Sequence, residues 1–191
     1  MSYALQIGAV IFGLAIIGIF KFNDQKSIKM LLAFSGAYLF SIVIIHFLPE
    51  LYEEKGAVIG LTVLAGFLLQ ILLDFYSTGL EHGHFHASHF KQGVFPLSAI
   101  VGLFAHEFFE GLPIELQNSE AGYKTMLLAV VLHKIPITVV VYALLNTIGI
   151  SSKKMWMVII MFALISPFGT LVGSLIPALG NYSAYLTAFA T

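Results

Sequence analysis

The hydrophobic pattern of this chain is a series of long apolar segments separated by short polar stretches. Six segments are long enough to cross a bilayer, since a transmembrane helix needs about 20 mostly apolar residues. A tail at 181–191 is also apolar but too short to cross, and it looks like the first turns of a seventh span. The pattern predicts an all-α, polytopic membrane protein in a single membrane domain over 1–191. The six predicted helices cover 2–20, 29–52, 57–79, 93–117, 122–147 and 154–176.

Composition supports this class and narrows the ligands. The chain is 59% hydrophobic and only 10% charged, whereas soluble domains carry about 25% charged residues. A formal net charge of −1 gives no basic surface for nucleic acid, so the expected surroundings are a lipid bilayer and a small ligand. Cysteine is absent, which excludes thiolate metal sites. Any transition metal would therefore be held by histidine, carboxylate or backbone oxygen.

The lysines predict how the chain is oriented. Two of the loops between predicted helices contain or closely flank one lysine each, whereas the other three, in strict alternation, contain or closely flank six together: Lys21, Lys26, Lys29, Lys91, Lys153 and Lys154. By the positive-inside rule these three loops face the cytoplasm. The N-terminus is then outside, and its apolar start without a basic leader is a first span rather than a signal peptide. A plasma or inner membrane is the expected location.

The third loop, 80–92, is rich in histidine. Four of the seven histidines of the chain fall within eight positions, and on the predicted topology they face the cytoplasm. Such tracts bind metals weakly and in multiple ways, which makes this loop a candidate metal-contacting segment; the alternative is a solvated loop with no specific role. The four residues are His82, His84, His86 and His89.

Ionisable residues also occur deep inside two neighbouring predicted helices. His106 and Glu110 are spaced i and i+4, so they share one helix face. His133 lies at a similar depth in the next helix, and at about 1.5 Å of rise per residue both positions fall near the bilayer midplane. Two imidazoles and a carboxylate suit a divalent transition-metal ion, with a coordination position left open for exchange. Glu107 is a further candidate ligand.

Glu107 and Lys134 directly follow His106 and His133. Each is turned by about 100° from its neighbour on a helix, so if the histidines converge, these two side chains can also meet. A lone lysine at mid-membrane is unfavourable unless it faces an acid. We therefore predict a Glu107–Lys134 ion pair, with a fixed positive charge where a second cation would otherwise sit. Pro113 and Pro136 lie close by and each frees a backbone carbonyl.

A second pair, His46 and Glu50, lies near the outer end of the second predicted helix, again on one face. With Glu53 and Glu54 just beyond, they form an acidic mouth that raises the local concentration of cations. The alternative is an ordinary helix end that stops near a proline. The hypothesis is that this mouth, together with Lys134, lies on the substrate path.

These motifs resemble the ZIP family of divalent metal transporters. The HEFFEGL sequence at 106–112 is similar to the family's His-x-x-x-Glu-Gly-Leu pattern, LHK at 132–134 to the branch with a His-Lys pair, and HFLPE at 46–50 to its His-Leu-Leu-Pro-Glu motif. The resemblance implies uptake of Zn²⁺, with Fe²⁺ or Mn²⁺ as alternatives, into the cytoplasm through His106, Glu110 and His133.

The resemblance also implies features that this sequence lacks. Many family members carry a bridging glutamate where this chain has Ile137, and with Lys134 this favours a single transported ion. The family has eight spans, so the chain is expected to be incomplete at its C-terminus. The resemblance further suggests an elevator-like movement of predicted helices one, four, five and six against the rest. The oligomeric state stays open, with a homodimer as one alternative.

Two other functions fit parts of the pattern. The sequence from His106 to Glu110 resembles the H-E-x-x-H helix of zinc hydrolases, with Glu107 as general base. An intramembrane metal-dependent hydrolase is therefore the alternative, although Glu110 replaces the second histidine and Lys134 would blunt the base. A metal sensor without transport is a third reading, supported only by the histidine-rich loop. Transport, with no enzymatic activity, explains the whole cluster best.

Overall fold

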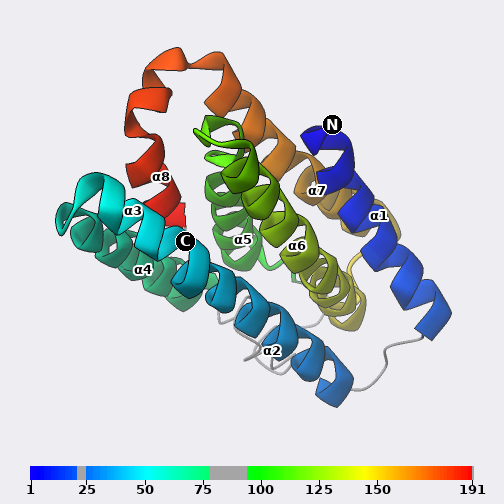
Figure 1. The fold of residues 1–191 in the computed structure, drawn as a ribbon. Helices are drawn as coiled ribbons and strands as arrows, with labels where there is room; N and C mark the ends of the chain where they lie inside the picture. The colour runs from blue at the N-terminus through cyan, green and yellow to red at the C-terminus, as the bar shows by residue number, and fades with distance from the viewer. Residues whose placement is uncertain (21–24, 78–93, 191) are drawn as a thin grey trace.

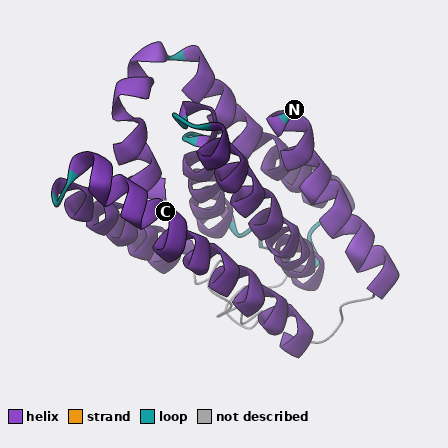
Figure 2. Ribbon diagram, in the orientation of Figure 1, coloured by secondary structure: helices purple, strands orange, loops and turns teal. Residues whose placement is uncertain are grey.

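The computed structural model describes residues 1–20, 25–77 and 94–190. This part of the chain contains helices and no strand (Figure 2). A π-helical turn, Val43–Phe47, joins α2 to α3, and 3₁₀ turns at Ile114–Leu116 and Pro177–Tyr182 follow α5 and α7. The α-helices are α1 Ser2–Phe20, α2 Gln25–Ile42, α3 Leu48–Lys55, α4 Val58–Ser77, α5 Leu97–Gly111, α6 Glu120–Ile148, α7 Ser152–Leu175 and α8 Ser183–Ala190.

The helices confirm the all-α, multi-pass class. Among the described residues, five helical stretches are long and apolar enough to cross a membrane: α1, the continuous stretch from Lys29 to Lys55, α5 with the turn after it, α6 and α7. The apolar part of α4, Val58–Leu73, is shorter. The fourth predicted span, 93–117, corresponds to the stretch Leu97–Leu116, but it is not one continuous α-helix, because α5 stops at Gly111 and Pro113 precedes a 3₁₀ turn. The apolar tail is helical, as α8.

The helices form two groups that meet around α5 and α6. In the first group, α1 packs against α6 and α7, and α5 packs against α7. In the second group, α4 packs against α8 and α3 (Figure 1). The groups touch where α2 packs against α6 and where α4 packs against α5. α5 and α6 therefore contact α1 and α7 within their own group, and they contact α2 and α4 outside it.

Buried polar side chains join three helices of the first group. The amide of Gln6 on α1 donates to Thr170 Oγ1 at 3.0 Å and accepts from Ser166 Oγ at 2.7 Å. Thr170 Oγ1 in turn donates to the carbonyl of Gly111 at 3.0 Å. All three side chains are fully buried. Within a bilayer such groups must satisfy one another, so this network ties α1, α5 and α7 together.

Glycines allow α5 and α7 to approach backbone to backbone. A Cβ added at Gly169 would lie 2.3 Å from the carbonyl oxygen of Phe108, and one at Gly111 would lie 2.2 Å from that of Ser166. Both distances are far inside van der Waals contact, and the obstructing atoms are backbone. Close approach through small residues is the usual way in which membrane helices associate.

We expect Gly169→Ala to destabilise the protein, because the new methyl group forces α5 and α7 apart. Overpacking of this kind costs about 1–3 kcal/mol, which is measurable as a lower thermal unfolding midpoint in detergent. Gly8→Ala on α1 is the matched control, since its Cβ would meet nothing within 4 Å. Equal midpoints for the two variants would contradict the proposed close packing.

Candidate metal centre

Three side chains from α5 and α6 converge on one point. His106 and Glu110, one turn apart on α5, and His133 on α6 each offer a ligand atom, and these atoms all lie within 4.8 Å of one another. Nε2 of His106 is 3.1 Å, and Nε2 of His133 3.9 Å, from Oε1 of Glu110. The two imidazole rings meet edge to face, with centroids 6.0 Å apart. We call these three residues the His/Glu cluster.

Two residues of the His/Glu cluster are buried, the third, His106, is partly exposed, and the carboxylate is poorly satisfied. Glu110 is 4% exposed and His133 is 7% exposed. Oε2 of Glu110 is buried with no hydrogen-bond partner among the described residues. Buried polar atoms are nearly always paired, so an exception points to an ion or water. A divalent cation bound by this carboxylate and two neutral imidazoles would have three protein ligands and a coordination position left open.

The Nδ1 atom of each imidazole also contacts a polar residue that the sequence analysis missed. Ser35 on α2 places its Oγ 2.9 Å from Nδ1 of His133, and Gln70 on α4 places its Oε1 3.1 Å from Nδ1 of His106. Each is a polar residue within an apolar stretch of its helix, Ser35 within 30–37 and Gln70 within 63–73. Because such residues usually face the interior of a bundle, this signal could have identified them.

The predicted ion pair between Glu107 and Lys134 is confirmed. Both side chains are completely buried, and Nζ of Lys134 donates to Oε2 of Glu107. Nζ also lies 4.5 Å from the centroid of the Phe162 ring, a cation–π contact that offsets part of the desolvation. Each member of the pair follows a histidine of the His/Glu cluster in the sequence. The carboxylate of Glu107 is paired with Lys134.

α6 passes through Pro136 without a break. The helix runs from Glu120 to Ile148, with the proline three residues after His133. Since proline has no N–H, the carbonyl four residues earlier, on Leu132, loses its helical partner. The predicted freed carbonyl is thus present, but the backbone of α6 is not unwound. Pro113, by contrast, lies outside an α-helix altogether.

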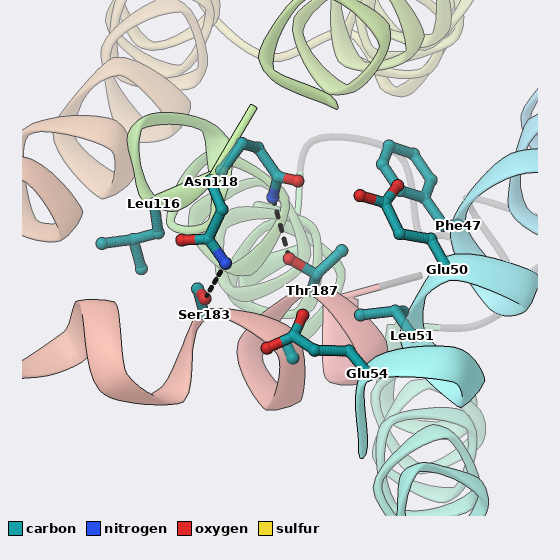
Figure 3. Close-up of a pocket in the computed structure, with 10 residues that line it drawn as sticks. Phe47, Glu50, Leu51, Glu54, Leu116, Asn118, Ser183 and Thr187 are labelled. Carbon is teal, nitrogen blue, oxygen red and sulfur yellow. Dashed lines mark hydrogen bonds between the residues drawn. The ribbon is translucent and has the colours of Figure 1, made fainter. Parts of the chain in front are cut away.

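A pocket opens at the end of the bundle where α3, α8 and the link between α5 and α6 meet. It contains about 320 Å³ of space, part of it open to solvent. Glu50 and Glu54 line one side, and polar residues of the opposite elements line the other (Figure 3). The full lining is Phe47, Glu50, Leu51, Glu54, Leu116, Gln117, Asn118, Ser183, Ala184 and Thr187. We call this the outer pocket, after the side of the membrane on which the sequence predicts Glu50 and Glu54 to lie.

Glu50 and His46 occupy different places near the outer pocket. Glu50 is exposed on its wall, whereas His46 lies one turn earlier, in the π-helical turn, and is not among the lining residues. Nε2 of His46 is buried and has no hydrogen-bond partner among the described residues. π-helical turns often occur at functional sites. The lining residues of the outer pocket do not include the His/Glu cluster.

The four histidines of the third loop, His82, His84, His86 and His89, lie outside the described residues. The structure therefore bears on the intramembrane residues and the outer pocket, and not on the predicted loop segment 80–92.

The fold and the buried cluster define a multi-pass helical membrane protein with ionisable residues gathered inside its spans. Residues 84–190 match a family model described as ZIP zinc transporter. This match covers more than half of the chain, and the chain belongs to the ZIP zinc transporter family. Membership implies transport of divalent metal ions. Searches of the curated proteins and of the solved structures found no match.

Proposed function

We propose that the protein carries Zn²⁺ through the membrane by binding it at His106, Glu110 and His133. The observation that carries this proposal is the convergence of three ligand atoms within 4.8 Å on two membrane-spanning helices. Ionisable residues at such positions are unfavourable in hydrocarbon unless they pair or bind an ion. The unpartnered Oε2 of Glu110 supports binding of a cation.

Zn²⁺ is the preferred substrate because of the ligand types. Two imidazoles and one carboxylate suit Zn²⁺ and other late first-row metals better than Mg²⁺ or Ca²⁺, which prefer oxygen ligands. Fe²⁺ and Mn²⁺ are the alternatives. The fixed charge of Lys134, one residue from His133, supports one bound ion rather than two.

The proposed path runs from the outer pocket to the cytoplasm. Glu50 and Glu54 would raise the local cation concentration in the outer pocket, and His46 would pass the ion inward. The excess of lysine in alternate loops supports an outside N-terminus, inward transport and a location in the cell membrane. His82, His84, His86 and His89 would receive the ion on the cytoplasmic side.

The hydrolase alternative gains little support from the geometry. Its general base would be Glu107, but that carboxylate is ion-paired with Lys134 and is not one of the three residues whose ligand atoms converge. A paired, fully buried carboxylate is poorly suited to accept a proton from a metal-bound water.

The test is uptake of ⁶⁵Zn²⁺ by proteoliposomes that contain the purified protein. We expect saturable uptake that is absent from empty liposomes, is reduced by competing Fe²⁺ or Mn²⁺, and is unaffected by Mg²⁺. Peptide and lipid substrates should not be turned over. A protein that is folded by thermal melting but gives no uptake above empty liposomes would contradict transport, and metal-dependent hydrolysis would favour the alternative.

A further inference from the structure

The partners behind the two imidazoles come from helices that carry none of the proposed ligands. The ligands are on α5 and α6, whereas Gln70 is on α4 and Ser35 is on α2. The contact between Ser35 and His133 is buried, and Ser35 is only 6% exposed. The orientation of both rings therefore depends on how α2 and α4 sit against α5 and α6.

Gln70 also determines which ring nitrogen of His106 faces the metal. Its Oε1 can only accept a hydrogen bond, so Nδ1 of His106 must carry the hydrogen. In a neutral imidazole the lone pair then lies on Nε2, which is the atom 3.1 Å from Glu110. The Ser35 hydroxyl can accept in the same way from Nδ1 of His133. Outer partners of this kind fix ring orientation and raise the basicity of metal-bound histidines.

We propose that Gln70 and Ser35 are positioning residues that set the affinity for the transported ion. This inference rests on the proposed function of the His/Glu cluster. Ser35 and Gln70 belong to α2 and α4, whereas the ligands belong to α5 and α6. The affinity for the ion is therefore high only while α2 and α4 keep these contacts with α5 and α6.

The test is the dissociation constant of Zn²⁺ alone, measured by competition with a chromogenic chelator on the purified full chain. We expect Gln70→Leu and Ser35→Ala each to raise the dissociation constant about 10–100-fold, the usual effect of losing an outer partner, with the number of bound ions unchanged. Gln70→Glu retains an acceptor oxygen and should restore affinity to near that of the wild type.

Controls separate positioning from a structural role. Ser41→Ala removes a hydroxyl from the same helix, α2, which among the described residues donates to the local carbonyl of Ala37, and this variant should bind Zn²⁺ normally. A merely structural loss would lower the number of sites and leave the dissociation constant unchanged. If Gln70→Leu does not fold, Gln70→Met takes its place, because it keeps the length of the side chain and replaces the amide oxygen with a sulfur that is only a weak acceptor.

The outcomes distinguish this inference from the proposed function. If Glu110→Ala loses binding while Gln70→Leu and Ser35→Ala bind like the wild type, the positioning role is overturned and the site stands. A lowered affinity for Gln70→Leu that Gln70→Glu does not restore also overturns it. If Glu110→Ala binds Zn²⁺ like the wild type, the site itself is wrong, and the inference falls with it.

Discussion

Glu110→Ala, His106→Ala and His133→Ala are each expected to abolish uptake of Zn²⁺ at low micromolar concentration. Each change removes one of three side chains whose ligand atoms lie within 4.8 Å of one another. Mutation of a residue that hydrogen-bonds a metal ligand lowers metal affinity about 10–100-fold. Loss of a ligand itself should therefore have a larger effect. Glu110→Ala should be the most severe, because it removes the only negative charge in the cluster.

The measurement is initial ⁶⁵Zn²⁺ uptake across a range of concentrations for equal amounts of folded protein. Glu120→Ala is the matched control, since Glu120 is exposed at the start of α6 and pairs with Lys124 on the surface. Its uptake should equal that of the wild type. Normal uptake by all three cluster variants would show that the ion takes another route, whatever the geometry of the cluster.

Breaking the Glu107–Lys134 pair is expected to destabilise the protein more than removing both charges. The side chains of Lys134 and Glu107 are both completely buried. Lys134→Met or Glu107→Leu alone leaves one charge without its counter-ion in the bundle interior, which costs about 3–5 kcal/mol. The double variant buries two apolar side chains of similar volume instead, and such replacements are often neutral or stabilising.

A double-mutant cycle on unfolding in mixed detergent micelles measures this coupling. We expect both single variants to lose stability and the double variant to recover most of the loss. When the stability loss of the double variant differs from the sum of the two single losses, the two residues interact. Additive losses, with the double variant least stable, would show that each residue is held by other contacts and that the ion pair contributes nothing of its own.

The ion pair and the His/Glu cluster lie next to each other on the same two helices but have opposite requirements. The pair is internally neutral, although Oε1 of Glu107 has no hydrogen-bond partner among the described residues, whereas the cluster has one carboxylate and two imidazoles, which together favour a bound cation. This contrast explains why Glu107 and Glu110, three residues apart on α5, have different partners. A single transported ion is the consequence that the uptake stoichiometry can test.

Much of the fold and the candidate cluster follows from the sequence for a clear physical reason. Apolar runs of membrane-spanning length have few alternatives to helix, because the bilayer leaves no other way to satisfy the backbone. Ionisable residues within them are rare, so His106, Glu110 and His133 were conspicuous. The i,i+4 spacing, the matched depth and the 100° step between adjacent residues were enough to predict both the convergence and the Glu107–Lys134 pair.

Only the tertiary structure decided which other helices complete the site. Ser35 is 98 residues from His133, and Gln70 is 36 residues from His106. In a soluble helix the polar face shows which side is exposed, but in a membrane helix every face is apolar, so periodicity does not reveal which neighbour a face will meet. The early end of α5, the π-helical turn at His46 and the hydrogen bonds behind each imidazole all depend on that packing.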